Sequence, residues 1–139
     1  MFKRILFAYN GQPVAEKALP YLEHLARSDD ADVIVLHVYQ PPDLYTAANG
    51  YEKLLETWEA LAQEVVADIV SYLREGGFDA EGRVEAGEPA ARILEIAHEE
   101  DVSLILLGAR GPSSVKDLLI GDVSTEVLRR TRRPVLLVP

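Results

Sequence analysis

Residues 104–124 of the chain read LILLGARGPSSVKDLLIGDVS. The stretch begins with an aliphatic run of strand length, and Gly108 follows directly. Gly111 and Gly121 complete the spacing G-x2-G-x9-G, and the third glycine precedes a segment with helical periodicity. A buried strand, a glycine-rich loop and a helix start in this order are typical of an α/β fold that binds its ligand at the carboxyl end of a strand.

The same alternation of short apolar runs and longer helical patterns extends towards both ends of the chain. Helical patterns begin near Pro13, Leu54, Pro89 and Val123. Strands that are apolar on both faces and separated by helices predict an α/β fold, a doubly wound, parallel five-stranded sheet with four helices on both faces. The other four strand-like segments are residues 5–9, 33–39, 80–85 and 135–138. The segment 80–85 is weaker than the others and typical of an edge strand.

The second helical pattern has one apolar stripe, which we expect to be its buried face. Gly76 and Gly77 end the pattern. The stripe consists of Leu54, Trp58, Leu61, Val65, Ile69 and Leu73.

Composition limits the classes of function that the chain can have. The chain has 139 residues, a formal net charge of −9 and no cysteine. This length suits one domain over residues 1–139, and the lack of cysteine excludes disulfides and Cys-based zinc sites. The negative charge argues against nucleic-acid and membrane-surface partners. Without a secretory signal or a membrane-spanning run, we expect a cytoplasmic protein.

The glycine spacing predicts an anion site, and Asp122 opposes it. An anion bound without charged side chains needs several backbone N–H groups at one place, and a helix N-terminus supplies up to four. A carboxylate at Asp122 would repel a phosphate there, and it also suits the N-cap of the last helix. Three states stay open: a Mg²⁺ ion bridging Asp122 and the phosphates, a shorter ligand such as AMP or adenosine, and an empty site.

Nearly the whole chain resembles the universal stress protein family. The glycine spacing is the motif of the family's ATP-binding members, in which Ser, Thr or Asn follows the third glycine. The resemblance implies the strand order 3-2-1-4-5, a homodimer formed through the last strand, and a regulatory role in the stress response through an unknown protein partner. The segments that carry it are AYNGQPVAEKAL (8–19), VIVLHVYQP (33–41), AGEPAARILEIA (86–97) and RPVLLVP (133–139).

The resemblance also implies which residues hold an adenine nucleotide. Asn10 stands where the family usually has Asp, and an amide has only one acceptor atom. Tyr39 and Tyr45 are interpreted either as an aromatic lid beside the adenine or as packing residues. The implied contacts are Ala8, Asn10 and the backbone of Val38 for adenine, Asn10 and Gly108 for ribose, and Gly111, Gly121 and the amides of Asp122 and Val123 for the phosphates.

Three hypotheses of function follow. In the first, the chain is a universal-stress-type regulatory protein that binds ATP or AMP. In the second, it is a dimeric interaction module without a nucleotide, in which Asp122 only caps a helix. The third is a slow Mg²⁺-dependent ATPase, for which the sequence offers neither a Walker-type Gly-Lys-Ser/Thr nor an evident base. The three histidines lack metal-ligand spacing and are expected to be structural or surface residues.

Overall fold

The computed structural model describes residues 1–41, 50–108 and 122–139. Five parallel strands form one sheet in the order β3-β2-β1-β4-β5, which confirms the predicted class and strand order. In the centre of the sheet, Ala8 of β1 lies opposite Leu36 of β2 on one side and Leu107 of β4 on the other. The strands are β1 (Arg4–Ala8), β2 (Asp32–Tyr39), β3 (Ala80–Ala86), β4 (Leu104–Gly108) and β5 (Val135–Val138).

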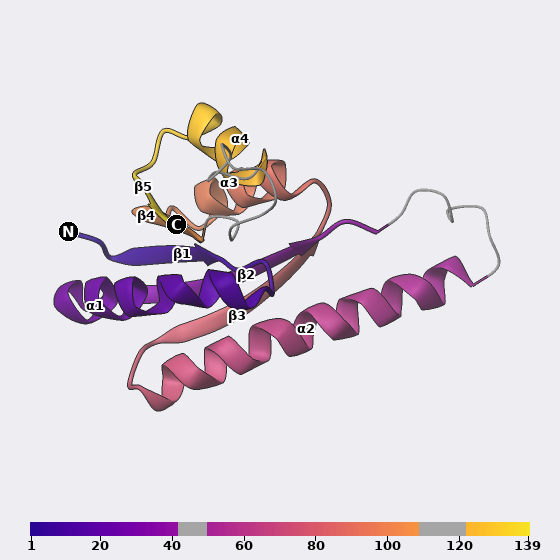
Figure 1. The fold of residues 1–139 in the computed structure, drawn as a ribbon, viewed down its shortest axis with the longest axis horizontal. Coiled ribbons are helices and arrows are strands. Elements are labelled where there is room, and N and C mark those ends of the chain that lie inside the picture. The colour runs from indigo at the N-terminus through magenta and orange to yellow at the C-terminus, as the bar shows by residue number, and fades with distance from the viewer. Residues whose placement is uncertain (42–49, 109–121) are drawn as a thin grey trace.

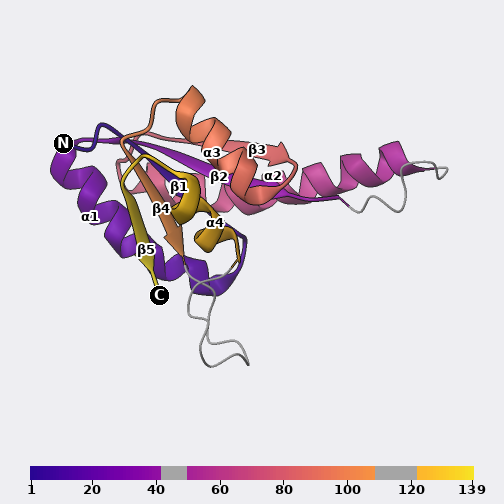
Figure 2. The same cartoon turned by 90° about the horizontal axis from the view of Figure 1, so that it is seen from above.

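Helices cover both faces of this sheet, as Figures 1 and 2 show. The helices α1 (Leu19–Asp29) and α2 (Tyr51–Glu75) lie on one face, where they bury Phe7 and Val35. The helices α3 (Pro89–Glu99) and α4 (Asp122–Arg130) lie on the other, where they bury Leu6 and Ile34. Alternate residues of each central strand therefore enter two separate cores, which explains why both strands are continuously apolar.

The helical pattern that begins at Pro13 is divided into two elements. Pro13–Ala18 forms a 3-10 helix, η1, and α1 begins only at Leu19. Pro20 stands in the first turn of α1, where a proline is tolerated because its missing N–H has no intrahelical partner. One continuous α-helix would place this proline in its interior, so the break falls immediately before it.

The apolar stripe predicted for α2 is wrong at Leu61. This side chain is 57% exposed, whereas Ala62 and Val66 are buried. A Cβ atom on Gly82 of β3 would lie 2.4 Å from a methyl group of Val66, so α2 approaches β3 closely at this glycine. Because α2 lies so close to β3 here, the face of the helix that carries Ala62 and Val66 is the one that packs against the sheet.

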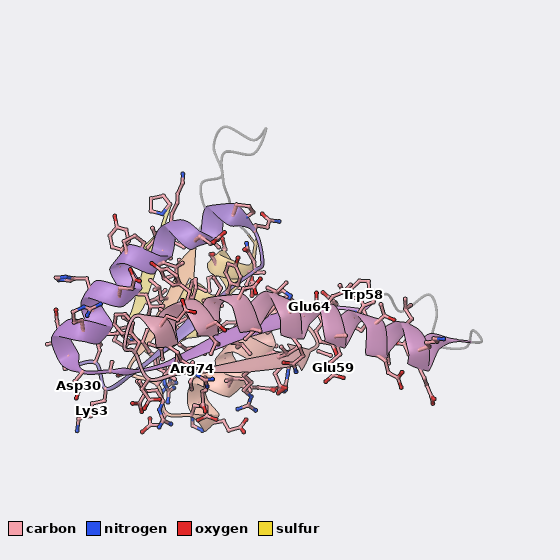
Figure 3. All side chains as sticks on the ribbon, turned by 90° about the horizontal axis from the view of Figure 1, so that it is seen from below. Lys3, Asp30, Trp58, Glu59, Glu64 and Arg74 are labelled. Atoms are coloured by element: carbon pink, nitrogen blue, oxygen red, sulfur yellow. The ribbon has the colours of Figure 1, made fainter. Side chains whose placement is uncertain are left out.

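The 25 residues of α2 extend past the sheet, and Figure 3 shows Trp58 towards the projecting end and Arg74 over the strands. Among the helices of the described segments, none is both long enough and apolar enough to cross a membrane.

An ionic cluster holds α3 against the edge strand β3. The guanidinium of Arg83 contacts Glu100 at 2.9 Å and Glu99 at 3.2 Å, and Glu100 also pairs with Arg4 of β1. Burial disfavours the charged form of Arg83, but the hydrogen bond and charge of Glu99, together with Glu85, hold its pKa above the ordinary value. The cluster helps to fix the helix that forms one wall of the pocket described next.

Candidate functional site

A pocket of about 240 Å³ lies at the carboxyl ends of β1, β2 and β4, between α3 and α4. The chain runs from β1 to β2 on one side and reaches β4 on the other, so the direction of winding reverses here. In open parallel sheets this reversal point is where ligands bind. The pocket is lined by Ala8, Tyr9, Asn10, Gln12, Leu36, His37, Val38, Pro89, Ile93, Leu107, Gly108, Val123 and Ser124.

The structure brings most of the predicted nucleotide contacts together. Asp122 is the first residue of α4, directly before Val123, but its side chain lies outside the described part of the chain. Gly111 and Gly121 also lie outside it. The predicted capping role of Asp122 and its predicted Mg²⁺ bridge therefore lie outside the described residues, and those residues contain no cluster of potential metal ligands. The five predicted residues that line the pocket are Ala8, Asn10, Val38, Gly108 and Val123.

The floor of the pocket is apolar and uncharged. Leu36, Ile93 and Leu107 belong to the core beneath α3 and α4, and the pocket opens above them. No aspartate, glutamate, lysine or arginine occurs among its described lining residues. Ser124, which is 5% exposed, adds a buried hydroxyl to this lining. A flat apolar ligand group with a few polar atoms fits such a lining.

The hydrogen-bond ladder between β1 and β2 ends at this pocket. Alternate residues of β2 direct their backbone groups towards β1, as Asp32 and Leu36 do, and the Leu36 carbonyl accepts from the Tyr9 N–H at 2.8 Å. Val38 is the next residue with this orientation, but the pairing of β1 stops at Ala8. The N–H and C=O of Val38 thus have no partner on β1 in the described structure, and both are available to a ligand.

Two side chains shape the turn that follows β1. The Nδ1 atom of His37 lies 2.8 Å from the carbonyl oxygen of Tyr9. Two residues on, the Gln12 N–H donates to the Oδ1 atom of Asn10 at 2.9 Å. The Asn10 bond is a local turn contact of the kind that asparagine favours, whereas His37 reaches the turn from another strand and leaves no local signal in the sequence. Together they fix the course of the chain from Tyr9 to Gln12 beside the end of β2.

The N-terminus of α3 is closed by its own cap. The carboxylate of Glu88 accepts from the N–H groups of Ala90, at 3.2 Å, and Ala91, at 2.6 Å. These amides would otherwise attract an anion. The other helix that begins at the pocket is α4, where the glycine motif ends. With its first amides engaged by Glu88, the N-terminus of α3 is less suited to an anion.

Gly108 has a structural reason to be glycine. A Cβ atom at this position would lie 2.9 Å from the Cα atom of Ala15, which is backbone and cannot rotate away. The 3-10 helix η1 therefore packs directly on the end of β4. The first glycine of the motif serves this packing, in addition to any contact with a ligand.

Tyr39 does not form an aromatic lid over the pocket. Its ring lies 6.5 Å from that of Trp58, centroid to centroid, on the α2 side of the sheet, and Tyr39 does not line the pocket. Burial, followed by the charges of Glu59 and Glu85, raises the pKa of the Tyr39 hydroxyl. Packing, the alternative interpretation, is thus correct for Tyr39, and Tyr45 lies outside the described residues.

Comparison with known proteins gives the same family at the level of sequence and of structure. The sequence model described as the universal stress protein family matches residues 1–139. The universal stress protein YxiE of Bacillus subtilis is 34% identical, with 99% of both chains covered. A universal stress protein of Thermus aquaticus is 33% identical, again over 99% of both chains.

Solved structures agree in fold. The structure of MJ0577, a universal stress protein of Methanocaldococcus jannaschii, superposes with a TM-score of 0.80 at 27% identity, covering 99% of this chain and 96% of that one. Two more distant structures, each 23% identical, are a universal stress protein of Archaeoglobus fulgidus in complex with dAMP (TM-score 0.71) and a universal stress protein in complex with cAMP (TM-score 0.65). They cover 100% and 99% of this chain, and 98% and 96% of their own. With the whole chain matched by sequence and by fold, the protein belongs to the universal stress protein family.

Proposed function

We propose that this chain is a regulatory protein of the stress response that binds an adenine nucleotide, ATP or AMP, in the pocket at the ends of β1, β2 and β4. The observation that carries the proposal is the free edge of β2 at Val38, which faces an uncharged apolar floor. Family members in complex with dAMP and cAMP support the same class of ligand.

The Val38 backbone suits the base. Adenine presents an acceptor, N1, beside a donor, the N6 amino group, and one residue of an unpaired strand edge presents a donor beside an acceptor. The apolar faces of the ring would lie over Leu36 and Ile93, where water is displaced. Two hydrogen bonds and an apolar slot thus account for base binding without a charged side chain.

The order of the strands determines in which direction the ribose and the phosphates extend from the base. Neighbouring strands are about 4.8 Å apart, so the step from β2 across β1 to β4 spans roughly 10 Å. A base at Val38 places the ribose near Asn10 and Gly108, and the phosphates at the start of α4, next to Val123. This path passes the predicted contact residues in the order base, sugar and phosphate.

Asp122 decides which phosphates are accepted. Its carboxylate repels a di- or triphosphate at the start of α4, unless a Mg²⁺ ion is shared between the carboxylate and the phosphate oxygens. AMP is shorter and carries less charge. We therefore propose that AMP binds without metal, and that ATP binds better when Mg²⁺ is present.

Calorimetric titration with ATP, ADP and AMP, each with and without Mg²⁺, tests the proposal. Saturable heat with AMP and a Mg²⁺-dependent gain with ATP are expected, whereas no heat at millimolar nucleotide would end it. If charge repulsion limits ATP binding, Asp122→Ser binds metal-free ATP about tenfold or more tightly. If Asp122 holds the metal, the same variant loses the Mg²⁺ effect. Glu64→Ser, on the exposed face of α2, is the matched control and should change neither result.

We also propose that the protein is a homodimer joined through β5. This strand is the last of the sheet, so one side of its backbone faces no other strand in the described structure. Beside it lies an apolar groove between α1 and β5 in which Tyr21 is 52% exposed. Light scattering should give twice the monomer mass for the native protein and the monomer mass for Tyr21→Lys; a monomeric native protein would refute the dimer.

A further inference from the structure

Asn10 offers the pocket a hydrogen-bond donor. The residue lies two positions beyond the end of β1 and lines the pocket beside Gly108. Its Oδ1 atom accepts from the Gln12 N–H at 2.9 Å. A backbone N–H can only donate, so the side-chain atom that faces it must be the oxygen. The orientation of the amide follows from this contact.

The rest of the amide is then available to a ligand. Because the group is planar, Nδ2 and its two N–H groups point away from the Gln12 amide. In the described segments no hydrogen bond reaches Nδ2, although Oδ1 is engaged. An aspartate could accept from Gln12 equally well, but it would present a second carboxylate oxygen in place of the amino group.

An aspartate and an asparagine at position 10 favour different groups on a ribose. A carboxylate accepts from free ribose hydroxyls and repels a phosphate ester in their place. An amide N–H donates to a phosphate oxygen and adds no charge. The described lining of the pocket has no carboxylate that would repel such an ester.

Asn10 lies where the ribose of the proposed nucleotide would pass between Val38 and the start of α4. Val38 lies beyond the last residue of β2 that pairs with β1, Asn10 follows β1, and Gly108 ends β4, so the three residues lie at the ends of three adjacent strands. With the base on the Val38 backbone, a ligand that continues towards α4 passes Asn10 one strand later, at roughly 5 Å from β2. The 2′ and 3′ oxygens are the groups that a nucleotide carries at this distance from the base.

We infer that Asn10 is a specificity-determining residue that donates from Nδ2 to a phosphate oxygen on the 3′ oxygen of the ribose. The pocket thereby accepts adenine nucleotides whose 3′ hydroxyl is esterified, as in 3′-AMP or 3′,5′-cyclic AMP, alongside 5′-AMP. This inference rests on the proposed function, since it presumes that the base occupies the Val38 edge.

The test compares 5′-AMP, 3′-AMP and 3′,5′-cyclic AMP by calorimetry on the native chain and on Asn10→Asp. Native protein should bind all three. In Asn10→Asp, the affinity for each 3′-esterified ligand relative to 5′-AMP should fall about tenfold or more, as expected for a carboxylate close to a phosphate. Gln63→Glu adds the same charge on the exposed face of α2, away from the pocket, and keeps the Asn10 donor, so it should change the relative affinities less than threefold.

The outcomes of these titrations separate a failure of the inference from a failure of the proposed function. Native protein that binds 5′-AMP but neither 3′ ester refutes the inference and leaves the proposed function intact. An Asn10→Asp variant whose relative affinities stay within twofold of the native ones refutes it as well. Native protein that binds none of the three ligands, nor ATP with Mg²⁺, refutes the proposed function itself.

A second variant covers the case in which Asn10→Asp does not fold. In Asn10→Ser the hydroxyl oxygen can still accept from Gln12, but the Nδ2 donor is gone. This variant should lose several-fold in affinity for both 3′ esters while 5′-AMP binding stays within twofold. Equal losses for all three ligands would contradict the inference.

Discussion

The Nδ1 atom of His37 lies 2.8 Å from the carbonyl oxygen of Tyr9, across the gap between β2 and the turn after β1. A carbonyl only accepts, so Nδ1 carries the proton and donates. In a continued parallel ladder the same carbonyl would accept from the N–H of Val38. His37 takes that place, and the Val38 N–H is left for a ligand. A histidine interpreted from sequence as structural thus shapes the pocket.

Replacing His37 by Phe should weaken ligand binding more than its effect on stability suggests. We expect a loss of about 1 kcal/mol in the free energy of unfolding, typical of one hydrogen bond. We also expect a several-fold loss in AMP affinity, because the Tyr9 carbonyl becomes free to pair with Val38. Urea unfolding and calorimetry measure the two effects, with His98→Phe on the exposed side of α3 as control. Unchanged AMP affinity in His37→Phe would show that the His37 bond to Tyr9 is not needed to keep the Val38 N–H available to a ligand.

Gly108→Ala should destabilise the fold by about 1–3 kcal/mol, the usual cost of overpacking. The added Cβ atom would lie 2.9 Å from the Cα of Ala15, so η1 must move away from the end of β4. Chemical unfolding gives the loss directly. A variant as stable as the native protein would show that η1 is free to shift, and that the glycine is present for another reason.

Glu88→Ala should cost about 1 kcal/mol of stability, because the amides of Ala90 and Ala91 lose their acceptor. The same change opens a second anion site at the start of α3, so sulfate should stabilise the variant more than it stabilises the native protein. Glu81→Ala, an exposed carboxylate on β3, controls for the loss of charge. If Glu88→Ala and Glu81→Ala respond alike to sulfate, the cap does not block the α3 terminus.

The acid side of the stability profile should depend on Asp29. The N–H of Phe2, 2.6 Å from the carboxylate, lowers the pKa of Asp29 below its ordinary value of 3.8, with the N-terminal ammonium assisting. A lowered pKa in the folded state adds stability above pH 3.8 and loses it as the pH falls through the folded-state value. The native protein should therefore exceed Asp29→Asn in urea midpoint at pH 6, and the difference should shrink by pH 3.

Asp30→Asn is the matched control for this profile. Asp30 caps the end of α1 at a φ of 52°, a conformation that asparagine also adopts readily. Its variant should follow the native protein in both conditions. A difference between native protein and Asp29→Asn that is independent of pH would attribute the effect of Asp29 to packing rather than to charge.

The fold was predictable because each strand and helix carries its own pattern. The apolar strands, the prolines and the glycines gave the elements, and their alternation gave the sheet. Leu61 was assigned to the wrong face because periodicity alone does not decide between neighbouring positions when a close approach, here Val66 on Gly82, sets the helix orientation. The break before α1 was missed although Pro20 marks it.

The candidate site was predictable in outline only. Its positions follow from the resemblance, and five of them share one pocket. The contacts that shape the pocket join residues far apart in sequence, as His37 and Tyr9 do, or use an unusual capping residue, as Glu88 does. The contact between His37 and Tyr9 leaves no local pattern, because it depends on how the strands are placed beside one another. The Glu88 cap is local, but glutamate is not among the residues that usually cap a helix start.

Backbone amide chemical shifts recorded during a titration with AMP test the central claim most directly. If the base occupies the free edge of β2 and the phosphate lies at the start of α4, the amides of Val38, Gly108 and Val123 shift together with one dissociation constant. Those of Leu25 and Leu136, in the groove between α1 and β5, stay in place. Shifts confined to that groove, or no shift at millimolar AMP, would contradict a nucleotide site in this pocket.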